Sequence, residues 1–319
     1  MSRYKEIDLS KITPTSIEDR DSKVETGQMA AVPQQGMKMS EFFSGLPPVL
    51  AAGDFKFIVE KIADAVINEK PVILMMGAHV IKVGLGPVVI DLMEQGILSS
   101  VAFNGAGAIH DSELAYFGKT SEDVGRFLKD GKFGMAKETA EILNSSADYA
   151  MENNLGFGEA VGGKITNDSP QYKNISITAA GFRLGIPVTV HVAVGTDIVH
   201  QHPGAKGMAI GDASMRDFRI FANVVSELGD GGVVLVFGSS VILPEVFLKA
   251  LTIARNIHGE IINFYTANFD MIRHYRPWMN VVTRPVQQGG RGVAIVGHHE
   301  IMMPLLSAAV KEEMHKRKN

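Results

Sequence analysis

Hydrophobic residues along the chain fall into two alternating patterns. From residue 71 onward, short apolar runs of strand length are separated by longer segments whose apolar residues recur at helical spacing. Pro71–Gly77 is such a run, and Gly86–Gln95 follows it with Val88, Leu92 and Met93 on one helical face. Because strands alternate with helices, we expect an α/β fold with a Rossmann-like, mainly parallel sheet that helices cover on both faces.

The same patterns give the expected bounds of each element. Strands are expected at Pro71–Gly77, Val101–Phe103, Pro187–Val194, Gly232–Phe237, Ile261–Phe264 and Gly292–Val296. Helices are expected at Phe55–Asn68, Gly86–Gln95, Thr120–Leu128, Met135–Asn153, Ser176–Gly185, Asp217–Leu228, Pro244–Asn256 and Glu300–Lys316. The stretch Asn154–Pro170 is rich in Gly, Asn and Ser and is expected to be a loop.

The first 50 residues differ from the rest because their apolar residues show little periodicity. Four prolines interrupt this segment, so we expect an N-terminal arm over residues 1–50 that ends in a short helix around Met39–Phe43. Residues 51–319 show no internal repeat and are expected to form a single domain. In an oligomer, such an arm commonly packs on a neighbouring subunit.

Composition narrows the class of protein. The 319 residues carry a formal net charge of -4 and include no cysteine, which excludes disulfides, thiolate catalysis, iron–sulfur clusters and cysteine-ligated zinc. The near balance of charge gives no reason to expect nucleic acid or a membrane surface as the partner. Because the N-terminus has no apolar signal segment, we expect a cytoplasmic protein that acts on a small molecule.

Residues with candidate catalytic or metal-binding side chains directly follow the predicted strands. Ligand sites of open parallel sheets lie beyond the carboxyl ends of the strands. The acidic residues Asp111, Asp197 and Glu300 lie in these places. Six of the ten histidines also directly follow predicted strands, namely His79, His110, His200, His202, His298 and His299. We therefore expect a pocket rich in histidine and carboxylate at this edge of the sheet.

Two interpretations of this pocket stay open. In the first, the site holds a divalent metal such as Zn, with ligands His79, His110, His200, His202 and His299. The metal would lower the pKa of a bound water, and Asp111 or Glu300 would take the proton. In the second, the same groups bind an anionic substrate or act as acid and base near neutral pH. In either case the catalytic candidates are Asp111, Asp197, His298 and Glu300.

Glycine-rich turns after two of the strands offer a second kind of site. Gly105 and Gly107, and likewise Gly238 with Ser239, leave backbone N–H groups near the starts of predicted helices. Such groups can bind phosphate or carboxylate oxygens. Glycine in these positions can also serve only to allow a tight turn.

An ordered series of segments over residues 70–310 resembles the deoxyhypusine synthase family. Gly105-Ala-Gly-Ala-Ile-His-Asp111 resembles the family's Thr-Ala-Gly-Gly-Val-Glu-Glu turn, and Thr196-Asp197 resembles its Thr-Asp turn. Gly238-Ser-Ser-Val-Ile242 and Pro304-Leu-Leu306 follow at corresponding places. The resemblance implies the fold, a site at the strand ends and a homotetramer. It also implies an NAD cofactor, whose binding site would be lined by Gly105, Gly107, Gly238, Ser239 and Thr266.

The sequence departs from that family at its catalytic groups. The place of the family's nucleophilic lysine is held by Arg284-Pro285, and its catalytic histidine falls at or near Pro244. Because a guanidinium stays protonated and is a poor nucleophile, the lysine imine chemistry is not expected here. Histidines stand near positions where the family binds its polyamine, at His202 and at His298-His299.

Three functions follow from these observations. The leading hypothesis is an enzyme with a repurposed histidine- and aspartate-rich pocket that performs hydrolase- or lyase-type chemistry on a small polar substrate. The second is an NAD-binding transferase that acts on a polyamine or amine. The third is a non-catalytic ligand-binding or scaffold protein.

Overall fold

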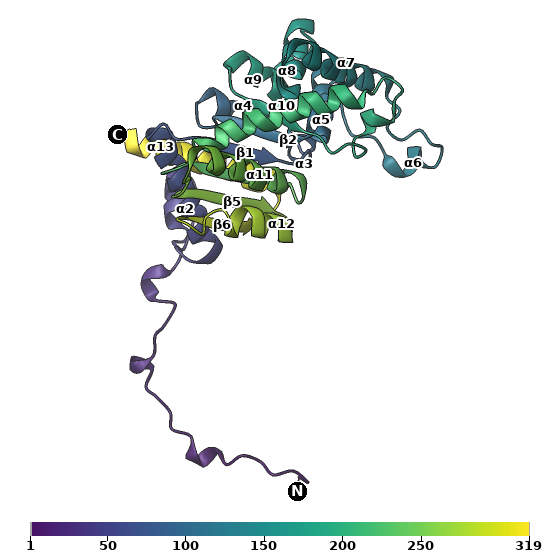
Figure 1. Ribbon diagram of the computed structural model, residues 1–319. Helices are drawn as coiled ribbons and strands as arrows, with labels where there is room; N and C mark the ends of the chain where they lie inside the picture. The colour runs from purple at the N-terminus through teal and green to yellow at the C-terminus, as the bar shows by residue number, and fades with distance from the viewer. Residues whose placement is uncertain (1, 319) are drawn as a thin grey trace.

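Six parallel strands form the sheet of the computed structural model, which describes residues 2–318 (Figure 1). Helices pack on both faces of this sheet, which confirms the expected α/β, Rossmann-like fold. The strands are β1 (Val72–Met76), β2 (Ser100–Asn104), β3 (Val188–His191), β4 (Val233–Phe237), β5 (Phe264–Asp270) and β6 (Gly290–Val296).

The helix at Gly105–Phe117 is not among those that the sequence predicts, and the helix expected at Asp217–Leu228 begins at Gly207. Helices otherwise alternate with the strands, as expected. They are α1 (Met39–Gly45), α2 (Leu50–Ile67), α3 (His79–Lys82), α4 (Gly86–Glu94), α5 (Gly105–Phe117), α6 (Val124–Leu128), α7 (Lys137–Asn153), α8 (Phe157–Asp168), α9 (Ile177–Leu184), α10 (Gly207–Ser226), α11 (Ile242–His258), α12 (Tyr275–Pro277) and α13 (His299–Lys318). Short 3-10 turns are η1 (Leu9–Lys11), η2 (Ile17–Asp19), η3 (Thr26–Gln28), η4 (Lys173–Ile175) and η5 (Ile198–Gln201), and η6 (Trp278–Thr283) is a π-helical turn.

The order of the strands creates a place where neighbouring connections diverge. The sheet runs β3-β2-β1-β4-β5-β6, so the chain builds outward from β1 in one direction and then from β4 in the other. Leu74 of β1 lies opposite Val101 of β2 and Leu235 of β4. In sheets of this kind, ligands bind beyond the carboxyl ends of the strands, near the point where the order reverses.

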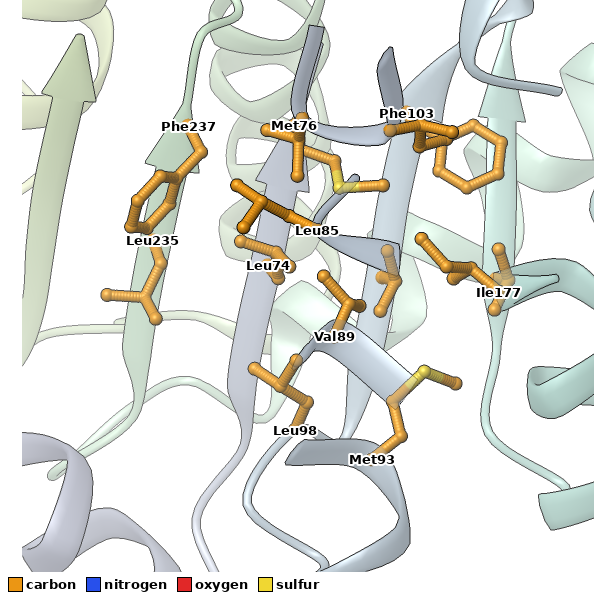
Figure 2. Packing of buried hydrophobic residues seen from close by; sticks show 14 of the residues in the cluster. Leu74, Met76, Leu85, Val89, Met93, Leu98, Phe103, Ile177, Leu235 and Phe237 are labelled. Carbon is orange, nitrogen blue, oxygen red and sulfur yellow. The ribbon is translucent and has the colours of Figure 1, made fainter. Parts of the chain in front are cut away.

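Successive residues of the central strands pack into two hydrophobic clusters on opposite faces of the sheet. Leu74 and Met76 of β1 belong to one cluster, and Ile73 and Met75 belong to the other. Figure 2 shows the first cluster, in which Val89 of α4 faces the same space as Leu74 and Met76. Because side chains alternate along a strand and both faces are covered, each central strand is apolar throughout.

One segment that the sequence predicts as a loop is a helix. The stretch Asn154–Pro170 contains α8, because its glycines allow the helix to approach its neighbours very closely. A Cβ atom on Gly158 would lie 1.8 Å from the carbonyl oxygen of Val188, and one on Gly162 would lie 2.2 Å from a backbone oxygen of α9. Tertiary packing therefore overrides the low helix propensity of glycine.

The fifth strand begins later than its pattern predicts. The sequence indicates a strand at Ile261–Phe264, but β5 starts only at the last of these residues and runs on to Asp270. Asn263, in the left-handed conformation with φ 57°, ends the preceding turn. Thr266 therefore lies within the strand, fully buried, and its hydroxyl donates to the carbonyl of Val281 at 2.8 Å. The sequence predicts Thr266 as part of a cofactor site, and the structure places its hydroxyl in a bond to the protein itself.

Residues 2–38 extend away from the body of the molecule (Figure 1). Their regular structure consists of the short turns η1, η2 and η3, and α1 begins at Met39, where the sequence predicts a short helix. Their apolar side chains are exposed, with 84% of Ile7 and 75% of Val32 accessible. None of the described helices is long and apolar enough to span a membrane.

Candidate active site

A cavity of about 930 Å³ lies beside α5, which begins at the carboxyl end of β2. It is bounded by α5, by the loop after β3 and by the connection Gly118–Ala136 between α5 and α7, here called the flap. Within the flap only Val124–Leu128 is helical, a shorter helix than the expected Thr120–Leu128. The volume of the cavity suits a small organic ligand. The lining includes the apolar residues Ile109, Phe117, Phe127, Phe133 and Ile198 and the polar residues Lys82, His110, Glu113, Thr120, Thr139 and Asp197.

His110 and Glu113 lie one helical turn apart on α5 and share bonds with the flap. Nδ1 of His110 is 2.6 Å from the hydroxyl of Thr120, which donates to Glu113. The hydroxyl of Thr139 on α7 also donates to Glu113, at 2.8 Å. Burial alone would raise the pKa of Glu113, but the hydrogen bonds outweigh it and hold the pKa below its ordinary value. Glu113 is therefore an ionised acceptor.

The bonds of Thr120 fix the tautomer of neutral His110. A hydroxyl has one proton to donate, and Thr120 gives it to Glu113. Thr120 must then accept from His110, so Nδ1 carries the ring proton and Nε2 keeps a free lone pair. Within the described chain Nε2 has no hydrogen-bond partner, and His110 lines the cavity. This nitrogen is available to a ligand, as a general base requires.

Asp197 lies at the N-terminus of α5. Its carboxylate accepts a hydrogen bond from the N–H of Ala106, and a Cβ atom on Gly105 would lie 1.9 Å from its Oδ2. Nε2 of His200 is 3.9 Å from the same oxygen. Burial raises the pKa of Asp197, and the neighbouring His200 and the Ala106 hydrogen bond offset this only in part. A carboxyl group that keeps its proton more easily than usual thus lines the same cavity as His110.

The glycines at the start of α5 serve close packing. Gly105 makes room for Asp197, and a Cβ atom on Gly107 would lie 2.7 Å from the ring of Phe103. The N–H of Gly107 donates to the side chain of Asn104 at 3.1 Å. A carboxylate of the chain itself therefore takes the position expected for a bound anion, and this turn is not an open phosphate site.

The two histidines after β3 bond to backbone groups. Nδ1 of His200 accepts from the N–H groups of Gly195 and Asp197, at 3.1 and 3.3 Å, so the proton of the neutral ring lies on Nε2. Nε2 of His202 donates to the carbonyl of Gly134 in the flap, at 2.8 Å. His200 shapes the turn after β3, and His202 connects that turn to the flap.

The remaining candidates lie at the carboxyl ends of β1 and β6, outside the lining of the cavity beside α5. The rings of His79 and His299 meet edge to face, with centres 5.8 Å apart. His299 is 1% exposed, and its Nδ1 has no hydrogen-bond partner within residues 2–318. His298 and Glu300 are exposed, and Nδ1 of His298 is 3.8 Å from Oε1 of Glu300.

Protein atoms fill the turn after β4. Gly238 adopts φ 64°, and a Cβ atom there would lie 2.4 Å from Nε2 of His299. A Cβ atom on Gly77 would lie 2.2 Å from the carbonyl oxygen of Gly238. The hydroxyl of Ser239 accepts from the N–H of Leu243 in the first turn of α11. These glycines let β1, β4 and α13 approach one another and leave no cradle for a phosphate between them.

Asp111, which the sequence predicts among the catalytic groups, lies outside the lining of the cavity beside α5. Its buried carboxylate accepts hydrogen bonds from the N–H groups of Ile177 and Thr178 and from the hydroxyls of Ser176 and Thr178. It thereby caps the start of α9 from α5, and both of its oxygens accept hydrogen bonds from the protein itself.

The histidines follow the strands, as expected, but they do not converge. His110 and His202 bond to the flap and His200 bonds to its own turn after β3, whereas His79 and His299 meet near β1. The groups around the flap and the pair His79 and His299 therefore occupy separate parts of the carboxyl edge of the sheet. Within residues 2–318, no group of three or more His, Asp or Glu side chains is placed to hold a metal ion.

Sequence reasoning missed three residues of the site, namely Glu113, Thr120 and Thr139. The helical spacing between His110 and Glu113 is a usable signal, because residues three apart on a helix face the same way. The two threonines lie on other elements and have no local pattern that would point to them.

No family model and no curated protein matches the sequence. Solved structures do match the fold. A LOR/SDH protein from Methanococcus maripaludis is 16% identical, with 85% of this chain and 71% of that chain covered and a TM-score of 0.51. The ternary complex of AgrE with ornithine and NAD+ is 12% identical, with 84% of this chain and 34% of AgrE covered and a TM-score of 0.55. A protein from Entamoeba histolytica, provisionally assigned as a deoxyhypusine synthase, is 9% identical, with 86% of this chain and 93% of that chain covered and a TM-score of 0.51.

At these identities the likeness concerns the fold alone. The resemblance to deoxyhypusine synthase that the order of segments predicts is confirmed at that level. This chain corresponds to about a third of AgrE, so what AgrE binds as a whole is a property of a longer protein.

Proposed function

We propose that the protein is an enzyme that moves a proton to or from a small polar substrate held in the cavity beside α5. His110 is the general base. The observation that carries the proposal is the hydrogen-bonded series Glu113–Thr120–His110, which leaves Nε2 of His110 free in a cavity of ligand size. A base that is oriented by further hydrogen-bonded groups is a common arrangement in acid–base catalysis.

The proposed step transfers one proton. Nε2 of His110 takes a proton from a C–H, N–H or O–H group of the substrate, the electron pair of that bond stays on the substrate, and the ring becomes an imidazolium. The carboxylate of Glu113, 3.8 Å from Nδ1, stabilises the positive charge. Asp197, whose pKa burial raises, supplies a proton to a leaving group. These roles are those of a lyase or a hydrolase.

The residues around the cavity favour a substrate with both polar and apolar parts. Lys82 and Asp197 provide opposite charges, and Phe117, Phe127 and Phe133 provide apolar surface. The AgrE complexes contain ornithine in one case and arginine in another. We therefore propose a small organic acid or amino acid as the class of substrate.

Exchange with D2O tests this proposal. The full chain is incubated in D2O with ornithine, arginine and phenylalanine, and proton NMR follows the loss of C–H signals. We expect exchange with at least one of the three, and we expect His110→Gln to abolish it while the ligand still raises the melting temperature. His258→Gln, an exposed residue at the end of α11, is the matched control. Equal exchange in His110→Gln and the unaltered protein would remove His110 as the base.

NAD is the second candidate, and the strand order favours it. Dinucleotides bind at the ends of β1 and β4 in sheets of this order, and AgrE holds NAD+ in its ternary complex. The turns expected to hold the phosphates do not fit, because Gly77 and Gly238 pack against protein atoms and Asp197 takes the start of α5. A rise of the melting temperature in millimolar NAD would favour this candidate over the first.

We also propose that the chain assembles as a homotetramer, as its resemblance to deoxyhypusine synthase implies. The N-terminal arm supports assembly, because its apolar side chains lie in the open rather than on the body of the same chain. Burying such side chains against a neighbouring copy would remove apolar surface from water, which favours association.

A further inference from the structure

The flap (Gly118–Ala136) is held by side-chain hydrogen bonds near its two ends. At its start, Thr120 bonds to His110 and Glu113 of α5. Near its end, the carbonyl of Gly134 accepts from His202. Between these points α6 is largely exposed, with 63% of Leu128 accessible. The flap can therefore separate from α5 by breaking a small number of hydrogen bonds.

We propose that Thr120 is a positioning residue that keeps His110 ready as a base only while the flap is seated. This inference rests on the proposed function, in which Nε2 of His110 takes the proton. With the flap seated, Thr120 accepts from Nδ1–H, and Nε2 of the neutral ring is unprotonated. When the flap leaves, Nδ1 loses its acceptor and the ring proton moves to Nε2, because the tautomer of an imidazole follows its hydrogen-bond partners.

Glu113 does not hold the tautomer by itself. Its Oε2 is 3.8 Å from Nδ1 of His110, which is beyond hydrogen-bonding distance, and the hydroxyl of Thr120 bridges the gap. Glu113 keeps its bond to Thr139 of α7 when the flap leaves. Thr120 is therefore the member of the series that moves with the flap.

The second anchor connects the flap to the segment that carries Asp197. Gly134 adopts φ 76°, and a Cβ atom there would lie 2.7 Å from side-chain atoms of both Gln201 and Ile198. A residue with a side chain would hold the flap away from this segment. The bond from His202 to the Gly134 carbonyl thus seats the flap beside the second candidate catalytic group.

Nitrogen NMR of the histidine rings reads the tautomer directly. At a pH where the ring is neutral, the unaltered full chain should show His110 protonated at Nδ1. Thr120→Val removes the hydroxyl with little change in shape and should move the proton to Nε2, and Thr120→Ser should restore the original tautomer. Thr252→Val, on the exposed surface of α11, is the matched control. A His110 tautomer that is unchanged in Thr120→Val would overturn the proposal.

Limited trypsin digestion tests the seating of the flap. The flap carries the trypsin sites Lys119, Arg126, Lys129 and Lys132. His202→Ala removes the second anchor, so cleavage at these sites should become several-fold faster, and the His110 rings should divide between both tautomers. His258→Ala should digest like the unaltered protein. Cleavage of His202→Ala at the original rate would show that His202 does not seat the flap and would overturn this part.

The positioning role and the proposed function fail separately. A change of tautomer in Thr120→Val with unchanged C–H exchange would mean that His110 is not the base, and the proposed function would fall. An unchanged tautomer in Thr120→Val together with lost exchange in His110→Gln would show that His110 is the base and that Thr120 does not set its tautomer. Both effects together, with recovery in Thr120→Ser, are the expected result.

Discussion

His110, His200 and His202 lie in one region of the molecule but present different nitrogens to it. Thr120 accepts from Nδ1 of His110, whereas Nδ1 of His200 accepts from backbone N–H groups and Nε2 of His202 donates to a carbonyl. The sequence shows imidazoles after strands. It does not show which nitrogen keeps a free lone pair, because that depends on partners from other elements.

A substitution at Gly105 tests the position of Asp197. Any Cβ atom there meets Oδ2 of Asp197 at 1.9 Å, so Gly105→Ala must push the carboxylate away from the N–H of Ala106. We expect a loss of about 1–3 kcal/mol in the free energy of unfolding, measured by urea denaturation. Gly207→Ala, where no atom lies within 4 Å, is the control. Equal stability of the two variants would contradict the position of Asp197.

Asp217 on α10 gives a pH dependence. Its buried carboxylate accepts from the N–H groups of Gly158 and Val190, and burial raises the pKa to about 7. Because the pKa is raised in the folded state, the contribution of this group to stability is fully present below about pH 4 and is lost as the pH rises through about 7. Asp217→Asn removes that loss. As the pH rises from 5 to 7.5, the melting temperature of Asp217→Asn should therefore rise relative to that of the unaltered protein. A constant difference would contradict this, and Asp212→Asn on the same helix is the control.

His191 on β3 should show the opposite dependence. Burial lowers its pKa to about 3, so the native ring stays neutral while the unfolded ring takes up a proton. Its contribution to stability is present above about pH 6.5 and is lost as the pH falls through about 3. The melting temperature of His191→Gln should therefore rise relative to that of the unaltered protein as the pH falls from 7 to 5. A gain in the other direction would contradict a neutral buried ring.

At the scale of elements, α5 organises the site. Its first turn meets Asp197, His110 and Glu113 share the side toward the flap, and Asp111 points to α9. The helical period explains this division, because successive residues are turned by about 100° and residues three apart nearly coincide. His110 and Asp111 are adjacent in sequence and therefore serve different partners.

The anchoring role of Asp111 makes a stability prediction. Asp111→Ala leaves the N–H groups of Ile177 and Thr178 buried without an acceptor, so the free energy of unfolding should fall by about 3 kcal/mol or more. Asp123→Ala removes a cap from the exposed helix α6 and should cost only about 1 kcal/mol. A melting temperature of Asp111→Ala that is close to that of the unaltered protein would contradict this anchoring role.

At the scale of the whole molecule, the candidate groups divide between two places along the carboxyl edge of the sheet. The cavity lies beside β2 and β3, while His79 and His299 meet at the ends of β1 and β4. Histidines after most strands predict that a site lies at the carboxyl edge of the sheet. They do not predict which histidines meet, because strand order follows from pairing between segments that are distant in the sequence. This is the physical reason why the expected five-histidine metal site is not formed.

The N-terminal arm makes a prediction at this scale. A hydrogen bond from Ala31 to the Gly45 carbonyl joins its base to α1, and Ile7, Ile17 and Val24 are 84%, 67% and 65% exposed. Deletion of residues 2–30 should leave the melting temperature of the body nearly unchanged but reduce the oligomer mass measured by light scattering. Substitution of Lys5 and Lys11 by Ser, which spares the apolar side chains, is the control. A deletion variant that keeps the mass of a tetramer would show that the arm is not needed for assembly.

The sequence by itself determined the alternation of strands and helices, the apolar core of the central strands and the presence of histidines at strand ends, because each of these is a local pattern. Its errors were also local. Glycines that signal a loop instead allow α8 to pack closely on β3 and α9, and β5 begins after the apolar run that predicts it. The tertiary structure alone decided that Thr120 reaches His110, that Asp197 fills the start of α5 and that Asp111 caps α9. Each of these contacts joins side chains of different elements, and no local pattern along the chain encodes such a meeting.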